Sequence, residues 1–428
     1  MDGINTDSKL ISQYERLLNL LRFDKGIDRG GLSRQLKLSM PTIYKAIDEL
    51  SSIGIVNKSE SNIEINPSYG ILVGISIGSS LCKIVFVDSN FQVLDSANFE
   101  YYKTILRDKF FQSEYFKEND LKQQENYIYF RTPNSFSKLK EILNFAFEGL
   151  EVFVENNINI LSIGISCTGI INNKTQTILN AHNLKFLDES TLESLIFPDK
   201  MSYFQSKGIE IFLIQNSDAT VIAEKIFLNQ NNPNYKEKKN IITLYLGVGI
   251  GAGIYLNGLY SGSNGYSGEI GHTKAPVYES EKDIQSAKEN NLEITCTCGN
   301  DDCYDYKIRT YVFGKNKVDF CNQNSDMIRA FLMNHPDKAE LFGKYLGNMV
   351  NTLTNLLNID LIIFTGKFYK SMDLLYNSIV SIQDKNQLKF SRNDCKLLTS
   401  EYGALSPAVG AAIYSYHKKY GLELAWDY

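Results

Sequence analysis

The stretch of residues 246–305 constrains the fold of this chain more than any other part of the sequence. It opens with LGVGIGAGIYLNG, whose glycines let the backbone turn tightly and approach another group closely, because glycine has no Cβ atom. It closes with CTCGNDDCYD, in which three cysteines occupy eight residues. With one histidine upstream, this short spacing is typical of a zinc site. The expected ligands are His272, Cys296, Cys298 and Cys303.

The length and charge of the chain limit the classes it can belong to. At 428 residues it is too long for one ordinary core, since domains usually have roughly 100–200 residues. A net charge of −5 argues against an overall polybasic nucleic-acid or membrane binder. The start, MDGINTDSKL, is not a signal peptide, and no apolar run reaches the roughly 18 residues of a membrane span. We therefore expect a multidomain cytoplasmic protein.

The N-terminal residues 1–68 have the pattern of a winged helix-turn-helix. Apolar side chains recur at helical spacing in residues 13–21, and a short helix is expected at residues 29–36. Ser39 is a suitable N-cap for a second helix that has Pro41 in its first turn. After Gly54, alternating apolar residues predict a small β-hairpin, the wing.

Charge supports a role for this unit in binding DNA. Between Arg29 and Ile47 the sequence has four basic residues and no acidic one, and phosphate neutralisation needs such a patch. The expected contacts with operator DNA are Arg34, Ser39, Thr42, Tyr44 and Lys45. The alternative is an interaction module with a solvated basic face.

The body of the chain follows an α/β plan that occurs twice. GILVGISIGSSLCKIVFVDSNFQVLDSANFEYY predicts three consecutive strands, and KKNIITLYLGVGIGAGIYLNGLY repeats that opening. Two similar sheets with a cleft between them suggest an internal duplication of the actin and hexokinase kind, a ribonuclease H-like fold. We expect a first lobe at 69–222, completed by a C-terminal helix in 406–428, and a second lobe with the zinc site at 223–405.

Several motifs together resemble the ROK family of repressors, open reading frames and sugar kinases. They are the helix-turn-helix, LGVGIGAGIYLNGLYSGSNGYSGEIGH, CTCGNDDCYD, LIIFTGK and SPAVGAAI, and they span essentially the whole chain. The resemblance implies that repressors of this kind sense a sugar or sugar derivative in the cleft and release DNA on binding it. It also implies a structural zinc held by His272 and the three cysteines. Residues 273–295 form a longer and more charged link between these ligands than is usual in the family.

The resemblance also implies a sugar site. Family kinases bind their sugar through an Asn-Asp pair, the Glu and His of GEIGH and a Glu after the last zinc cysteine. Here Glu269 and His272 are present, and Asp305 replaces that last Glu. Asn216 stands where the family has its catalytic Asp, and Gln215 precedes it.

Two positions argue against phosphoryl transfer. A carboxylate accepts the proton of the sugar hydroxyl as general base, and the amide of Asn216 cannot. Ser76 replaces the family's Asp in the first phosphate loop, which helps to hold the metal and phosphates of ATP. A shifted alignment offers Asp218 as an alternative base.

These observations predict a sugar-responsive transcriptional regulator, a repressor without enzyme activity, that acts as a homodimer or homotetramer. The alternative is an active ATP-dependent sugar kinase that also binds DNA. A third hypothesis is a regulator controlled by a partner protein through the charged segments 103–126 and 279–290. The simpler interpretation of those segments is solvated loops.

Overall fold

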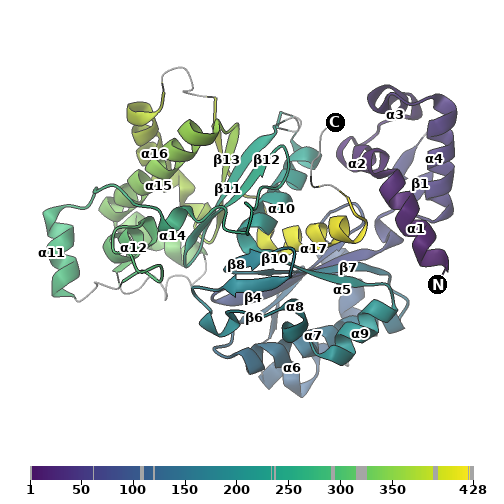
Figure 1. The fold of residues 1–428 in the computed structure, drawn as a ribbon, viewed down its shortest axis with the longest axis horizontal. Coiled ribbons are helices and arrows are strands. Elements are labelled where there is room, and N and C mark those ends of the chain that lie inside the picture. The colour runs from purple at the N-terminus through teal and green to yellow at the C-terminus, as the bar shows by residue number, and fades with distance from the viewer. Residues whose placement is uncertain are drawn as a thin grey trace.

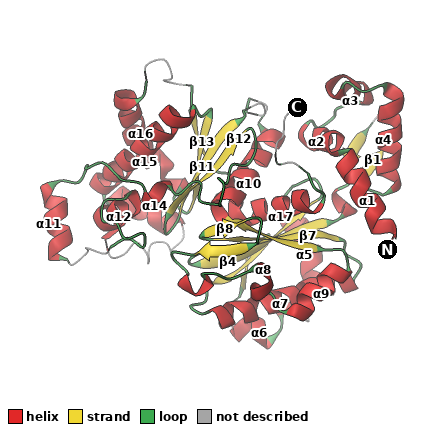
Figure 2. Cartoon of the chain, in the orientation of Figure 1, coloured by secondary structure: helices red, strands yellow, loops and turns green. Residues whose placement is uncertain are grey.

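The structure is a computed structural model in which residues 2–60, 62–106, 110–118, 121–232, 234–235, 238–290, 295–314, 325–388, 394–422 and 424 are described. A small N-terminal unit lies beside two larger lobes, each built on its own sheet (Figure 1). Helices cover the sheets of both lobes (Figure 2). This arrangement confirms the predicted fold class.

The N-terminal unit is a four-helix unit with a two-stranded wing. Its elements are α1 (Asp2–Gln13), α2 (Glu15–Phe23), α3 (Arg29–Leu36), α4 (Met40–Ser52), β1 (Val56–Lys58) and β2 (Ile63–Ile65). The Asp28 and Ser39 side chains cap α3 and α4 by accepting from Gly31 N and Thr42 N. The helix-turn-helix and its wing are therefore confirmed, and α1 is an additional helix that sequence periodicity did not predict.

The first lobe contains a six-stranded mixed sheet in the order β10-β7-β3-β4-β6-β5. Its strands are β3 (Ile71–Ile77), β4 (Leu81–Asp88), β5 (Lys122–Gln123), β6 (Tyr127–Arg131), β7 (Ile160–Cys167) and β10 (Glu210–Gln215). A separate hairpin is formed by β8 (Ile170–Asn172) and β9 (Thr177–Asn180). The helices of this lobe are α5 (Ser96–Leu106), α6 (Glu114–Glu118), α7 (Phe136–Glu155), α8 (Leu192–Leu195) and α9 (Pro198–Ser206).

The prediction of a third strand directly after β4 is wrong. Only an isolated bridge between Val87 and Val93 is found there among the described residues, and α5 begins at Ser96. The helix buries Phe99 and Leu106, and the Phe99 ring stacks on Phe86 of β4 with centroids 5.7 Å apart. This segment forms a helix because its apolar face packs against the sheet. The third antiparallel strand, next to β4, is β6 instead.

The second lobe contains a four-stranded sheet in the order β12-β11-β13-β14. Its strands are β11 (Asn240–Leu246), β12 (Ile250–Leu256), β13 (Leu361–Gly366) and β14 (Lys396–Thr399). Its helices are α11 (Glu281–Glu289), α12 (Tyr304–Lys307), which continues into a π-helical turn (Ile308–Phe313), α14 (Ser325–Asn334), α15 (Pro336–Leu357) and α16 (Met372–Asn386). The hairpin β11–β12 repeats the antiparallel pairing of β3 and β4.

Two helices connect the sheets: α10 (Asn216–Asn231) and α17 (Ser406–Lys419). α17 packs on β3 and β7 of the first sheet and on α10, which in turn packs on β12 of the second. These contacts are very close. A Cβ atom at Gly410 would lie 1.7 Å from the Ala219 carbonyl oxygen, and one at Gly253 would lie 2.0 Å from that of Ser217. Glycine is therefore required at both helix contacts.

The expected lobe boundary at 222/223 falls inside α10, and the domain boundaries remain predictions. Of the expected C-terminal helix in 406–428, residues 423 and 425–428 lie outside the described part.

The segment 103–126 is anchored to the first lobe by buried apolar side chains. Within its described part Leu106, Phe110, Phe116 and Leu121 are buried, while residues 107–109 and 119–120 lie outside the described residues. The segment 279–290 contains α11, which begins at a capping box between Ser280 and Asp283. Neither observation bears on a partner protein, so that hypothesis stays a prediction.

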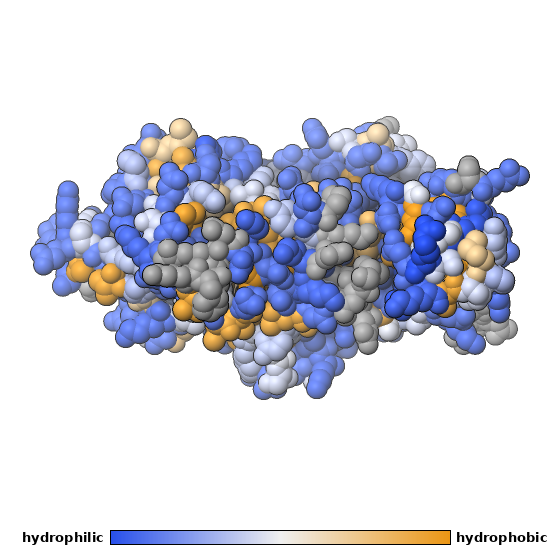
Figure 3. Space-filling view, turned by 90° about the horizontal axis from the view of Figure 1, so that it is seen from above, coloured by the Kyte–Doolittle hydropathy of each residue, from blue (hydrophilic) through white to orange (hydrophobic). Residues whose placement is uncertain are grey.

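Most of the face seen in Figure 3 is hydrophilic, with apolar residues in patches. No helix among the described residues is long and apolar enough to cross a membrane.

Candidate metal centre and ligand cleft

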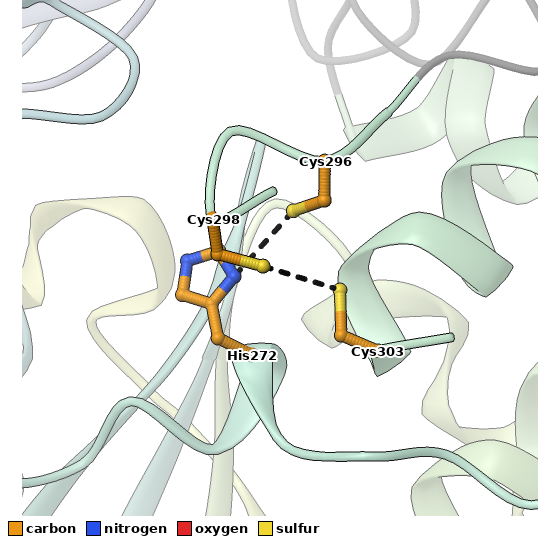
Figure 4. A group of neighbouring side chains, drawn as sticks. All are labelled: His272, Cys296, Cys298 and Cys303. Atoms are coloured by element: carbon orange, nitrogen blue, oxygen red, sulfur yellow. Dashed lines mark hydrogen bonds between the residues drawn. The ribbon is translucent and has the colours of Figure 1, made fainter. Parts of the chain in front are cut away.

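The four expected zinc ligands lie together. The donor atoms of His272, Cys296, Cys298 and Cys303 all lie within 4.8 Å of one another. Figure 4 shows the three sulfur atoms and the imidazole turned toward a common centre. His272 Nδ1 lies 3.5 Å from Cys296 Sγ, and the sulfur atoms of Cys298 and Cys303 are 3.9 Å apart.

These separations fit four ligands arranged as a tetrahedron around one metal ion. With Zn–S bonds of about 2.3 Å and Zn–N bonds of about 2.0 Å, tetrahedral geometry requires edges of about 3.5–3.8 Å. Local structure sets the ligands in place: Cys303 caps α12 by accepting from Tyr306 N at 3.4 Å, and Lys274 forms a bridge with Cys303. The Cys3His donor set therefore fits zinc. All four positions are ligands, so the ion would hold the loop and leave no position for an activated water.

His272 connects this metal centre to the cleft between the lobes. Its Nδ1 faces the cysteines, whereas its Nε2 lies 3.9 Å from a Glu269 carboxylate oxygen. The rings of His182 and His272 are 5.1 Å apart between centroids. A zinc ion on Nδ1 would fix the ring, so that Nε2 carries a proton and donates into the cleft.

The cleft brings together every expected sugar-binding residue. Asn216, Glu269, His272 and Asp305 line it, as do His182 and Asn183. Gln215 Nε2 donates to Glu269 Oε1 at 3.0 Å. Burial raises the pKa of the Glu269 carboxyl, with His272 and His182 acting in the opposite direction. These groups offer both donors and acceptors, as adjacent sugar hydroxyls require.

Asn216 lines the cleft and has an acceptor that no described group uses. It is the first residue of α10, and its Nδ2 donates to the Ile77 carbonyl at 3.3 Å. Its Oδ1 is buried and has no hydrogen-bond partner among the described residues. A buried acceptor without a donor is costly, and a ligand hydroxyl would satisfy it.

Asp305 has a structural contact as well as a place in the cleft. It is buried, and its Oδ1 accepts from Ile250 N, the first residue of β12, at 3.0 Å. One carboxylate oxygen therefore forms a hydrogen bond with the start of β12 in the glycine-rich hairpin. The other, Oδ2, lies next to Gly249.

Ser76 and Asp218, the other two positions considered for kinase chemistry, do not line the cleft. Ser76 is buried within β3 and is not among the described residues that line the cleft. Asp218 is also buried away from the cleft lining, and its carboxylate accepts from the Ser261 hydroxyl. A general base must be within hydrogen-bond reach of its proton, so this geometry argues against the shifted alignment.

Sequence reasoning missed several residues that line the cleft, among them Lys83 and Lys367. Lys83 lies in β4, where a lone lysine within LCKIVFVD was the available signal. Lys367 follows β13 directly as the last residue of the LIIFTGK motif, whose charge was given no role. Both side chains line the cleft.

The expected DNA-contacting residues lie in α3, in the turn that follows it and in α4. Arg34, Ser39, Thr42, Tyr44 and Lys45 are all exposed. Arg29 instead holds the wing, because its guanidinium donates to the Ser59 and Glu60 carbonyls at 3.0 and 3.1 Å and so fixes the wing to α3. The roles of the five exposed residues in DNA binding remain predictions.

Comparison with known proteins identifies the family. The model of the ROK family matches residues 111–418, which is most of the chain. The chain belongs to the ROK family. The expectation drawn from the GEIGH and cysteine motifs is thereby confirmed.

Relatives within the family include both regulators and kinases. The xylose repressor of Bacillus spizizenii is 28% identical over 262 residues, 59% of this chain and 60% of that repressor. The N-acetylmannosamine kinase of Haemophilus influenzae strain 86-028NP is 34% identical over 114 residues, 26% of this chain and 34% of the kinase. The chain thus spans less than two thirds of the length of these relatives.

Solved structures share the fold. A ROK family transcriptional regulator, a homologue of the Escherichia coli MLC protein, superposes with a TM-score of 0.68 at 17% identity, covering 96% of this chain and 98% of that one. A Streptomyces griseus ROK glucokinase in complex with glucose and AMPPNP gives a TM-score of 0.56 at 17% identity, covering 81% and 99%. The match to the regulator extends over the N-terminal unit as well.

Proposed function

We propose that this protein is a sugar-responsive transcriptional repressor without kinase activity. It binds operator DNA through the exposed surface of α3 and α4 and binds a sugar between its lobes. The observation that carries the proposal is Asn216, an amide with a buried free acceptor at the position where a sugar kinase needs a carboxylate. This group can hold a hydroxyl and cannot remove its proton.

The metal centre supports the sensor function. We propose that zinc fixes His272, and through it Glu269, so that the sugar meets a rigid set of polar groups. The proposed zinc is structural, because its four protein ligands fill a tetrahedral shell.

A continuous set of contacts links the cleft to the DNA-binding unit. Asn216 begins α10, α10 packs on α17, and Tyr416 of α17 contacts Arg22 of α2. We propose that closure of the lobes on a sugar shifts α10 and α17 and thereby moves the helix-turn-helix. In a homodimer, such a movement changes the distance between the two recognition helices, which must match half-sites about one helical turn apart.

The test combines DNA and sugar binding. Fluorescent DNA from the region upstream of the protein's own gene is titrated with purified protein, with and without xylose, the sugar named for the repressor relatives, and other pentoses and hexoses. We expect one sugar to weaken DNA binding by about 5-fold or more, and the same DNA to weaken sugar binding by an equal factor. A sugar that binds without any change in DNA affinity would contradict the proposal.

The kinase alternative is checked in parallel. The protein is incubated with ATP, Mg²⁺ and each sugar that binds, and ADP release is followed. We expect no phosphorylation above the background rate, whereas turnover of any of these sugars would establish the enzyme instead.

A further inference from the structure

Large apolar side chains are exposed where the second helix of the helix-turn-helix begins. Leu38 lies in the turn before α4 and Met40 is the first residue of α4, and we call these two side chains the apolar patch. They are 40% and 38% exposed, and Tyr44, one helical turn further along α4, is 49% exposed. Among the described side chains of the N-terminal unit, no other large hydrophobic residue is exposed to this degree. Apolar groups that gather at one part of a surface often mark a binding site.

The turn that carries the patch is fixed by its own backbone and by a helix cap. Lys37 ends α3 with a left-handed backbone, at a φ of 54°. Ser39 then caps α4, because its hydroxyl accepts from Thr42 N at 3.3 Å. Every residue from Lys37 to Thr42 is exposed. The conformation of the turn therefore leaves its apolar side chains partly open to the solvent.

Basic residues accompany the apolar patch. Arg34 of α3, Lys37 in the turn and Lys45 of α4 are all exposed, and the sequence from Arg29 to Ile47 has no acidic residue. A partner that suits both features carries negative charge around an apolar group. DNA has this combination, since phosphates border the major groove and each thymine presents a C5-methyl group within it.

The place of the patch in the fold agrees with such a partner. In a helix-turn-helix, the N-terminal residues of the second helix contact base edges. Met40 occupies this position in α4, and Figure 1 shows α4 on the side of the N-terminal unit away from the two lobes. The polar side chains next to it are partly committed, because the Ser39 and Thr42 hydroxyls hydrogen-bond each other at 2.7 Å. An apolar contact would therefore add discrimination that these hydroxyls provide only in part.

We propose that Met40 packs against the C5-methyl group of a thymine in the major groove of the operator. Thymine is preferred at this base pair, since cytosine lacks the methyl group and presents an amino donor that an apolar side chain cannot pair with. This inference rests on the proposed DNA-binding function and adds a base preference to it. Leu38 precedes the N-cap, where an apolar side chain often packs on the helix that follows, so the test uses Met40.

Deoxyuridine isolates the contribution of the methyl group. It replaces thymine without changing the phosphates or the hydrogen-bonding groups of the base. DNA from upstream of the protein's own gene is prepared with thymine or with deoxyuridine throughout, and the full chain is titrated with each. We expect deoxyuridine to weaken binding by about threefold or more, the effect of withdrawing one methyl group from an apolar contact. Met40→Ala should bind thymine DNA more weakly and lose most of the difference between the two DNAs.

Two further variants separate recognition from folding. Met40→Gln keeps the length of the side chain but gives it a polar end, so it should also lose the difference between the two DNAs. It replaces Met40→Ala if circular dichroism shows that the alanine variant does not fold. Met333→Ala is the matched control, because Met333 is 59% exposed on α14 of the second lobe. This variant should keep the full preference for thymine DNA.

The outcomes keep this inference apart from the proposed function. Equal binding of thymine and deoxyuridine DNA, or an equal loss in the natural protein and the Met40 variants, overturns the thymine contact and leaves DNA binding in place. Failure to bind either DNA at low salt overturns the proposed function and the thymine contact with it. A change from dimer to monomer in Met40→Ala, measured by sedimentation, assigns the apolar patch to a contact between two copies and contradicts the thymine contact.

Discussion

The Arg22 guanidinium of the DNA-binding unit donates to the Tyr416 hydroxyl of the C-terminal helix at 3.0 Å, across a fully buried interface. The same guanidinium donates to the Ser89 carbonyl and to Asn19 Oδ1 at 3.1 Å each, and it lies 4.2 Å from the centre of the Phe91 ring. Its contacts come from α2, the loop after β4 and α17. One side chain therefore fastens the helix-turn-helix to the first lobe.

Replacing Arg22 by Met should loosen this attachment. Each partner left without a donor costs about 1–3 kcal/mol, so we expect clear destabilisation and earlier proteolytic cleavage between the N-terminal unit and the first lobe. The effect of an effector on DNA affinity should also fall, since the two units no longer move together. Melting curves, limited proteolysis and DNA titrations measure these three results.

The matched control is Arg329→Met. Arg329 forms a bidentate pair with Asp373 on the surface of the second lobe, and exposed pairs contribute at most about 1 kcal/mol. We expect this variant to keep normal stability and coupling. Equal behaviour of the two arginine variants would show that Arg22 has no special role.

Zinc removal provides the next prediction. Purified protein should contain one zinc ion per chain, and Cys298→Ser should lose most of it with a lower melting temperature, because the metal's binding free energy contributes to folding. Atomic emission and thermal melting measure both effects. Cys395→Ser is the control, since that buried cysteine lies apart from the His272 group, and it should retain its zinc.

Much of this centre was predictable because its determinants are local. Cys296, Cys298 and Cys303 are close in sequence, so that little chain has to be ordered to bring them together. The helix-turn-helix was also predictable, since Ser39 and Pro41 mark the start of α4 and Gly54 follows its end.

Features that depend on packing between distant segments were not predictable. Lys83 and Lys367 are 284 positions apart and meet only when the two lobes assemble. Arg22 has no visible partner in the sequence, because Tyr416 lies near the other end of the chain. The segment after β4 has apolar residues compatible with strand or helix, and only the packing of Phe99 on Phe86 decides between them.

The recognition surface leads to a prediction about DNA. Lys45 is exposed on α4, and its only ion pair among the described residues is a 3.8 Å contact with Glu49. Lys45→Ala should weaken DNA binding at every sequence and reduce the slope of log affinity against log salt by about 1, as expected for one lost phosphate contact. Lys274→Ala, on the exposed surface of the second lobe, should change neither quantity.

Tyr44 is expected to act differently. Its ring is 49% exposed and lies 5.4 Å from the Arg29 guanidinium that holds the wing. Tyr44→Ala should reduce affinity for the operator more than for unrelated DNA, because base contacts carry the sequence preference. Competition titrations with operator and random DNA check this, and an equal loss on both would contradict a base-reading role.

Buried Asp218 makes the stability of the protein depend on pH. Burial raises the pKa of its carboxyl to about 7, with the Ser261 hydroxyl lowering it and nearby Glu269 raising it further. Tyr414 also interacts with it. The folded state therefore holds a proton between about pH 4 and pH 7 that the unfolded chain has already lost, so stability from this group falls as pH rises through that range.

Asp218→Asn should remove this dependence. At pH 5 the variant and the natural protein should melt at similar temperatures, because the natural carboxyl is then protonated and neutral. Above pH 8 the variant should melt about 2 °C or more higher, since it no longer buries a charge. Asp326→Asn on the exposed end of α14 should show no such divergence between the two pH values. A constant difference between Asp218→Asn and the natural protein from pH 5 to pH 8 would mean that Asp218 does not titrate in this range.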